Sequence, residues 1–548
     1  MTGASSGIDS PAGIESPAKP GRTVNRWLTL TVACLAVFSV MVASSIVNVL
    51  LPTLTREIDA STEDLLWIVD GFNLVFAALV LAGGSLSDRF GRKGALIAGL
   101  AIYAFASTMS AFATNAELLI AWRALAGLGA AAVFPTTLSI ISNAFPDRAE
   151  RAKAIGLWGA STGISVALGP IVGGALAEAS AWGAAFGFCS AAAVVTIVLA
   201  VFFVPDSRDP EVPRLDYPGL LLSTLALGML VYAIIQAPER GWGSPASLGD
   251  FGAATCLFVA FAIWETHVPQ PMLDVRLFTN MRFTAASGAV TLSFFGLFGF
   301  VFLIGQYFQF VLGWGVLDAG IRQVPAALSI AVSSLLGTFL AVRLGTKLVV
   351  ASGLVIMCGG FAWVATVDGT TTYPTIAAQM IVIGAGVGFT SAPATEAIMG
   401  VVPAAKAGIG SAVNDATREL GGTLGIAIVG SVAASIYRDR LADSITDPQI
   451  LDIARSSAGA ANVLAQKLGD PSLAVTAQNG FLDGLAAGSL VASGVSLLGA
   501  LLALAFLPAH PRVPEAETEH PVAHPGVTPT HHKPLTVAPA VVRLAESD

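Results

Sequence analysis

Five ionisable residues lie inside long apolar stretches of the sequence, where a charge is costly. They are Asp70, Arg123, Asp415, Arg418 and Glu419. On insertion scales a charged side chain at the centre of a membrane helix costs at least ~2.5–3.5 kcal/mol, so residues in such positions are candidates for a functional role. Asp415 and Glu419 are spaced i,i+4, which places both carboxyl groups on one face of a helix. We expect these carboxyl groups to bind and release protons or to hold a cation.

Structural ion pairing is the alternative role for the same residues. Asp70 and Arg123 lie at similar depths in their apolar stretches, about 7–8 Å from the outer edge at 1.5 Å per residue, so they could pair between helices. Arg418 could likewise neutralise Asp415. Glu419 is expected near the middle of the bilayer. Both interpretations, pairing and proton handling, stay open for these residues.

The loop after the apolar stretch around residue 75 combines one acid and three bases with two glycines. Its candidate gating residues are Gly84, Asp88, Arg89, Gly91, Arg92 and Lys93. Glycine lets helices approach closely, an aspartate can lie at a helix N-terminus, and the bases can hold a gate by charge pairing. The spacing of Arg89, Gly91 and Lys93 recurs at Arg343, Gly345 and Lys347, as expected of an internal repeat. Val342 stands in the position of Asp88.

Small residues dominate the apolar stretch around residue 165. The motif consists of Gly156, Ser165, Gly169, Pro170, Gly173 and Gly174. Glycines allow close contact between helices, and Pro170 removes one hydrogen bond within its helix, so this helix can pack tightly and bend. A generic packing face of small residues is the alternative interpretation.

The stretch around residue 296 is rich in phenylalanine, which suits a cavity for lipophilic molecules. We expect Asn48, Phe295 and Gln306 to line this cavity, together with Phe294, Phe298 and Phe300. The alternative is that the phenylalanine side chains face lipid.

The composition requires a membrane around these residues. The chain has 548 residues, of which 54% are apolar and 12% are charged, whereas soluble proteins carry about 25% charged residues. A membrane crossing takes roughly 20 apolar residues, so little of the chain remains for a catalytic domain. We expect no enzyme activity, no nucleic-acid partner, no cofactor, and no structural disulfide among cysteines that all lie in apolar segments.

A window of about 20 residues predicts fourteen membrane-spanning helices and therefore an all-α membrane protein. Their centres lie near residues 39, 75, 103, 130, 165, 193, 227, 258, 296, 330, 357, 386, 421 and 494. An even number of spans places both termini on one side of the membrane. Most Lys and Arg residues of the short loops lie on that side, which predicts that both termini are cytoplasmic. The polar segments 1–26 and 508–548 are expected to be disordered.

These motifs resemble the fourteen-span drug:proton antiporters, a family of the major facilitator superfamily, over about residues 27 to 507. The loop at 84–93 resembles the hallmark loop of the superfamily, and 156–174 resembles its antiporter motif, with Ser165 replacing one glycine. Further matches occur at Ser45 to Val49 with Pro52, Trp67 to Asp70, Arg123 to Gly129, Gly241 to Gly243, and Ser411 to Glu419. Two positions depart from the family: Ala43 replaces an aspartate and Ala126 replaces a glutamine.

The resemblance implies a major facilitator fold with two six-helix bundles and an inserted helix pair. The bundles would comprise residues 27–205 and 271–507, the pair would lie within 206–270, and an extracytoplasmic loop would span 438–478. It also implies a monomeric multi-pass protein of a bacterial plasma membrane.

By the same resemblance, the chain would export lipophilic drugs and antibiotics in exchange for protons by alternating access. The proton-coupling residues would be Asp70, Arg123, Asp415, Arg418 and Glu419. Ala43 lies where the family has an acid in the first span. Asp70 and Glu419 are therefore the stronger candidates for proton coupling. Export of an endogenous lipid or metabolite is one alternative, and a non-transporting membrane receptor is another.

Overall fold

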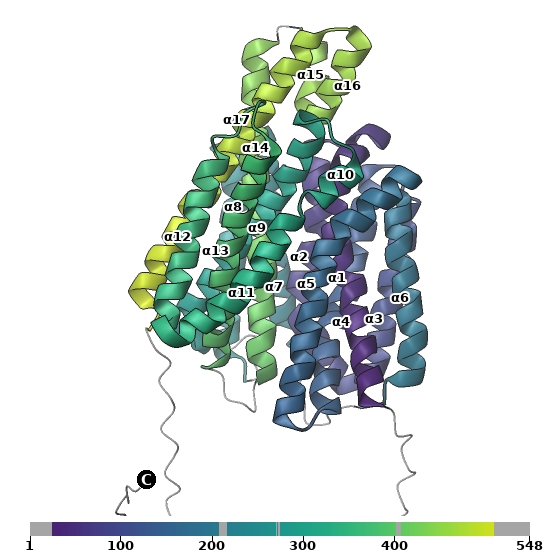
Figure 1. Cartoon of the computed structure of the whole chain (residues 1–548), viewed down its shortest axis with the longest axis vertical. Coiled ribbons are helices and arrows are strands. Elements are labelled where there is room, and N and C mark those ends of the chain that lie inside the picture. Colours follow the sequence, from purple (N-terminus) through teal and green to yellow (C-terminus); the bar gives the residue numbers. More distant parts are fainter. Residues whose placement is uncertain are drawn as a thin grey trace, which may run out of the picture. The chain divides into compact units, whose positions relative to one another are not determined.

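The computed structural model describes residues 25–207, 216–269, 271, 275–401, 407–445 and 447–508. These residues form helices joined by mostly short connections, and they contain no strand (Figure 1). The expected all-α fold is therefore confirmed. The expected disorder of 1–26 and 508–548 concerns residues that lie almost entirely outside this description.

Six long helices form the first group. They are α1 (Arg26–Glu57), α2 (Thr62–Phe90), α3 (Arg92–Ala111), α4 (Ala116–Ala144), α5 (Arg148–Ala179) and α6 (Gly183–Phe203). Ser61 and Asp64 form a capping box that starts α2. Gly91 joins α2 to α3 with φ 112°, a backbone conformation that favours glycine because it has no Cβ. Within the group, α1 packs on α5, and α4 packs on α2 and α3.

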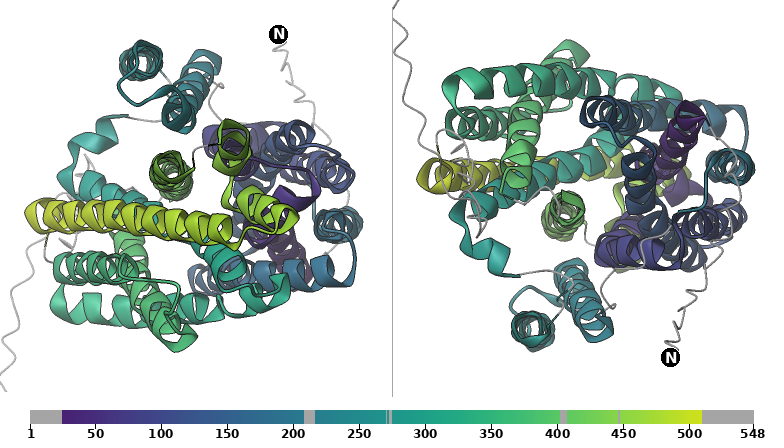
Figure 2. Two further views of the ribbon diagram at one scale, coloured as in Figure 1. Left: turned by 90° about the horizontal axis from the view of Figure 1, so that it is seen from above. Right: turned by 90° about the horizontal axis from the view of Figure 1, so that it is seen from below.

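A helical hairpin follows the first group. It consists of α7 (Tyr217–Arg240) and α8 (Pro245–His267), and the chain reverses at Gly241, where φ is 87°. The two helices pack on each other, and α7 also packs on α2 and α14. Figure 2 shows the hairpin at the periphery of the other helices.

The remaining helices form the second group. They are η1 (Val275–Thr279), α9 (Met281–Gln306), η2 (Tyr307–Val311), α10 (Val316–Ile321), α11 (Val324–Leu344), α12 (Thr346–Val364), α13 (Tyr373–Met399), α14 (Ala407–Ser444), α15 (Pro448–Ser456), α16 (Ala458–Leu468) and α17 (Pro471–Phe506). Gly345 joins α11 to α12 with φ 88°, as Gly91 joins α2 to α3. This equivalence supports the predicted repeat of the loop spacing. The expected loop 438–478 contains α15 and α16, while α14 and α17 extend into it from both sides.

Each of the fourteen predicted spans coincides with one long helix. Thirteen of the described helical segments are long and apolar enough to cross a membrane. The remaining span is α2, which is 29 residues long and carries Glu63, Asp64 and Asp70 in its first half.

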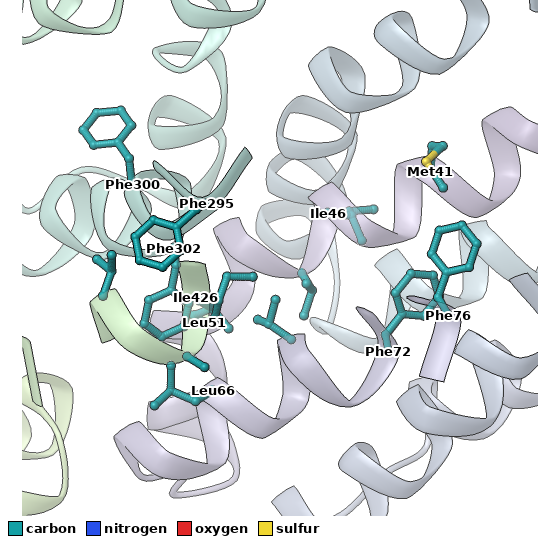
Figure 3. Close-up of a cluster of buried hydrophobic side chains, with 14 of the residues drawn as sticks. Met41, Ile46, Leu51, Leu66, Phe72, Phe76, Phe295, Phe300, Phe302 and Ile426 are labelled. Carbon is teal, nitrogen blue, oxygen red and sulfur yellow. The ribbon is translucent and has the colours of Figure 1, made fainter. Parts of the chain in front are cut away.

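The two groups of helices meet mainly along three seams, α2 with α14, α5 with α10, and α1 with α9. Figure 3 shows Leu51 of α1 and Leu66 of α2 close to Phe302 of α9 and Ile426 of α14. All four side chains are buried, so the apolar core continues across the seam. At one end of the helices, α1 ends, α2 begins and α10 lies. We call this end the α10 end.

Candidate functional site

Asp70 lies in α2 and is fully buried. Its exposed fraction is 0%, and neither carboxyl oxygen has a hydrogen-bond partner among the described residues. Asn73 follows one turn later, is 2% exposed, and has an unpartnered Oδ1. A buried polar atom without a partner costs about 1–3 kcal/mol. Burial of Asp70 and Asn73 therefore lowers the stability of the fold.

Arg123 of α4 does not pair with Asp70, so the alternative of an ion pair between these two residues is not found. Arg123 Nε donates to the Ile68 carbonyl over 3.0 Å, and Nη1 donates to the Ala43 carbonyl over 3.3 Å. Its guanidinium also lies 4.5 Å from the centre of the Phe72 ring. The guanidinium is therefore held by backbone oxygens of α1 and α2 and by an aromatic face. Ala43, the position of the missing family acid, contributes one of these oxygens.

The three ionisable residues of α14 are half-buried and lie within little more than one helical turn. Asn414 Nδ2 donates to Asp415 Oδ1 over 3.5 Å, and Arg418 Nη2 donates to Thr395 Oγ1 of α13 over 3.4 Å. The Arg418 guanidinium lies 5.1 Å from the Phe294 ring of α9. The alternative role, neutralisation of Asp415 by a direct ion pair with Arg418, is therefore not found between these described side chains. Arg418 binds α13 and α9, and the carboxyl groups of Asp415 and Glu419 form no ion pair with the side chains that the structure describes.

The residues of the gating loop bind mainly within the first group of helices. Gly84 faces Pro135 of α4, where an added Cβ would lie 3.3 Å from the proline ring. Arg92 N donates to the Ser207 carbonyl over 2.9 Å, and Lys93 Nζ donates to the Val201 carbonyl over 2.8 Å. The loop is thereby attached to the end of α6.

Asp88 and Arg89 belong to the last turn of α2. Asp88 is thus not at the N-terminus of α3, and its side chain lies outside the described part of the structure. Arg89 is exposed. The gating role of this loop stays a prediction.

The glycines of the α5 motif lie at two helix contacts. A Cβ on Gly169 would overlap Ser45 of α1, and a Cβ on Gly173 would overlap Ile46. Gly174 faces α10 instead, where an added Cβ would lie 2.5 Å from Leu317 Cα. Ser165 is buried and donates to the Ser161 carbonyl over 2.6 Å. The motif therefore joins α5 to α1 and also to α10, while Gly156 lies nearer the start of α5, with its surroundings undescribed.

Contacts across the α10 end hold the two groups of helices together. Leu317 N donates to Glu178 Oε1 over 3.0 Å, and Gln309 Nε2 donates to the Val49 carbonyl over 2.8 Å. Thr62 Oγ1 donates to the Ser456 carbonyl over 2.9 Å. The α10 end is thus closed by direct hydrogen bonds between the groups.

The substrate cavity expected around Asn48, Phe295 and Gln306 stays a prediction. Gln306 lines a cavity of about 30 Å³ with Thr62, Phe302, Gly430 and Tyr437 among others, which is room for about one water molecule. This volume is far below that of a drug-sized pocket. Two of the residues expected there, Asn48 and Phe295, do not line it.

Asn48 and the phenylalanines of α9 are buried in helix contacts. Asn48 is 3% exposed and donates to the Ser44 carbonyl over 3.2 Å. Phe295 and Phe300 are 5% and 4% exposed, so the alternative that they face lipid is wrong. Phe294 and Phe298 are half-buried and pack against the same core. These side chains therefore pack against protein in this structure.

The site also contains polar residues that the sequence reasoning missed. Asn73 of α2 and Thr423 of α14 are both buried with unpartnered oxygens. Asn73 follows Asp70 by three residues, so i,i+3 spacing of polar residues in an apolar helix was a usable signal. Thr423 had no such signal, because single threonines are common in membrane helices.

The chain is similar to known proteins over most of its length. The family model described as Major Facilitator Superfamily matches residues 33–426. The multidrug efflux pump LfrA of Mycolicibacterium smegmatis is 36% identical over 455 residues, which cover 82% of this chain and 90% of that protein. The methylenomycin A resistance protein of Bacillus subtilis is 33% identical over 392 residues, covering 71% of this chain and 83% of that protein.

A solved structure shares the fold at low sequence identity. It is a bacterial homolog of the human lysosomal transporter Spinster in an inward-facing, unoccupied conformation, with a TM-score of 0.64 and 17% identity. The match covers 90% of this chain and 99% of that structure.

Proposed function

Because this chain belongs to the Major Facilitator Superfamily of membrane transporters, we propose that it exports lipophilic small molecules in exchange for protons. Similarity to a multidrug efflux pump and to an antibiotic resistance protein supports the substrate class. The observation that carries the proton exchange is Asp70, whose two carboxyl oxygens are buried and unpartnered. An ionised carboxylate without a partner is very costly in an apolar site, whereas the proton-bound form is neutral. Asp70 therefore binds a proton whenever the site is closed as it is here.

The chain works as a monomer by alternating access in this proposal, with both termini in the cytoplasm. Arg89, Arg92 and Lys93 lie at the end opposite the α10 end, which agrees with the preference of basic residues for the cytoplasmic side. The contacts of Glu178 with Leu317 and of Gln309 with Val49 then close the outer side. Opening this side releases substrate and admits protons.

Asp415 and Glu419 supply the second proton-binding position. They lie on one face of α14 and form no ion pair with a described residue, and their half-buried side chains can meet both water and substrate. One charge crossing 100 mV releases about 2.3 kcal/mol, and each pH unit adds about 1.4 kcal/mol. One proton could thus sustain a substrate gradient of roughly a hundredfold or more.

The first test replaces Glu419 by Gln, which keeps the shape of the side chain but cannot exchange a proton. In everted membrane vesicles with an acidic lumen, a pH-sensitive dye reports proton release caused by added substrate. We expect the wild-type chain and the exposed control Glu57→Gln to release protons, and Glu419→Gln to lose at least about tenfold in rate. Unchanged release by Glu419→Gln would exclude it as a coupling residue.

The substrate class is tested by accumulation of a panel of lipophilic dyes and antibiotics in cells that express the chain. Export of several unrelated compounds that stops when an uncoupler is added is the expected result. Export that persists with the uncoupler would indicate a facilitator. Export of none of the compounds would favour an endogenous lipid or metabolite as the substrate.

A further inference from the structure

The seam between α2 and α14 has a defined register. Leu66 of α2 touches Gly430 of α14, because a Cβ on Gly430 would overlap Leu66 Cδ2. Thr62, one turn earlier in α2, lines the same small cavity as Ala434 and Tyr437, which come later in α14. Residue numbers thus rise along one helix as they fall along the other, so the two helices run antiparallel.

Helical periodicity extends this register toward the middle of the seam. Asp70 and Asn73 follow Leu66 by four and seven residues, so they lie on the same face of α2. Thr423 and Glu419 precede Gly430 by seven and eleven residues, so they lie on the facing side of α14. At 1.5 Å per residue, Asn73 and Thr423 are both about 10 Å from the Leu66 contact, while Asp70 is about 6 Å and Glu419 about 16 Å from it.

Asn73 and Thr423 lie between Asp70 and Glu419 along the seam. Both residues are buried, and a side-chain oxygen of each lacks a hydrogen-bond partner among the described residues. Asn73 is 2% exposed and Thr423 is 0% exposed. Asn73 Oδ1 and Thr423 Oγ1 have no hydrogen-bond partner among the described residues. By contrast, Thr417 Oγ1 of α14 donates to the Asn414 carbonyl over 2.8 Å and Ser87 Oγ of α2 donates to the Gly84 carbonyl over 2.8 Å, whereas Ser431 Oγ of α14 also lacks a partner among the described residues. Unsatisfied oxygens at one level of a seam indicate a place for water, which requires two to four polar partners.

We propose that Asn73 and Thr423 form a proton path between Asp70 and Glu419 through the α2–α14 seam. The path rests on the proposed proton exchange and specifies how its two acids communicate. Direct transfer is excluded because Asp70 and Glu419 are separated by about 10 Å along the seam. Water molecules held by the Asn73 amide and the Thr423 hydroxyl bridge this distance.

Each transfer along the path conserves atoms and charge. The O–H bond of the Asp70 carboxyl breaks, and its proton passes to a bridging water, which gives up another proton to the Thr423 oxygen. The hydroxyl releases its own proton toward Glu419, where a new O–H bond forms. Asp70 ends as a carboxylate and Glu419 as a neutral acid. Asp415 and Arg418 are the other charged groups on the α14 side of this path, and Arg123 of α4 is occupied by backbone carbonyls.

The test compares Thr423→Val with Thr423→Ser in the full-length chain. Valine has nearly the shape of threonine but cannot relay a proton, whereas serine keeps the hydroxyl. Thr417→Val is the matched control because it removes a buried hydroxyl that is already bonded within α14. Proton release from everted vesicles is measured after addition of the lipophilic dye Hoechst 33342, and equilibrium binding of the same dye is measured on the purified chain.

We expect Thr423→Val to slow proton release at least about tenfold with dye affinity unchanged, and Thr423→Ser and Thr417→Val to remain within about twofold of wild type. Asn73→Leu is the second variant, and it should slow release as well. Neither apolar variant should unfold at a lower temperature than wild type, because each removes an unsatisfied polar group.

Two outcomes contradict the proposal in different ways. Release by Thr423→Val and Asn73→Leu at the wild-type rate would overturn the path and leave the proposed exchange intact. No dye-induced proton release by the wild-type chain would overturn the exchange, and the path with it.

Discussion

Asp70 and Arg123 show two ways in which one membrane protein buries an ionisable residue. Arg123 donates from Nε and Nη1 to two backbone carbonyls and lies over an aromatic ring, and only its Nη2 lacks a partner among the described residues. Neither oxygen of Asp70 has a partner in the part of the chain that the structure describes, so only the neutral form fits its surroundings. A residue whose burial depends on a bound proton is suited to couple proton binding to conformation.

This contrast predicts opposite effects of neutral substitutions. Asp70→Asn should leave the thermal unfolding temperature of the purified chain unchanged or raise it, while substrate-induced proton release is lost. Arg123→Gln should destabilise the chain by about 1–3 kcal/mol, because carbonyls of α1 and α2 lose their donor. Unfolding of Asp70→Asn at a clearly lower temperature would mean that Asp70 makes a stabilising contact.

At the scale of elements, α5 is the helix whose glycines set the distance to its neighbours. Ser45 and Ile46 of α1 occupy the space that side chains on Gly169 and Gly173 would fill. Close approach of this kind is a major source of attraction between helices in lipid, where the hydrophobic effect is absent. The α5 motif is therefore a contact surface in the closed arrangement.

Gly169→Ala should destabilise the closed arrangement by about 1–3 kcal/mol, because the added methyl group overlaps Ser45. Gly163→Ala is the control, since an added Cβ there meets nothing within 4 Å, and alanine should slightly stabilise the helix. Thermal unfolding in detergent measures both. Equal unfolding temperatures for the two variants would show that α1 moves aside at no cost.

At the scale of the whole molecule, the α10 end is where the two groups of helices bind each other. Gly320 of α10 packs directly on the Pro170 carbonyl of α5, so a side chain at Gly320 would separate the groups there. Alternating access requires this contact to break and re-form. The bend that Pro170 allows in α5 lies next to the contact that must open.

Gly320→Val should shift the chain toward an arrangement that is open at the α10 end. The measurement uses a variant without the four native cysteines that carries Asn48→Cys, which is buried in the closed arrangement. A membrane-impermeant maleimide should label this cysteine several-fold faster with Gly320→Val. Gly359→Val should have no such effect, because Gly359 has open space around it. Equal labelling of the two variants would contradict this role of the α10 contact.

The sequence by itself determined the helices, because apolar length and turn chemistry are local properties. All fourteen predicted spans coincide with helices, and Gly91 and Gly345 occupy equivalent positive-φ turns, as their repeated spacing predicted. It also identified Asp70 and Arg123 as ionisable residues buried in membrane helices, since a charge in an apolar stretch is visible without a structure, but it did not identify Glu265, which is 3% exposed in α8.

Only the tertiary structure decided which groups meet. Arg123 and Asp70 lie at similar depths, yet the guanidinium binds backbone carbonyls of two neighbouring helices, which no side-chain pattern reveals. The phenylalanines of α9 likewise pack inward, and Asn73 and Thr423 come to the same level of a seam through the register of two helices far apart in sequence. The depth of a residue in the membrane follows from its position along one helix. The partner of its side chain depends on the rotation and crossing angle of two helices, which are set by packing of the whole bundle.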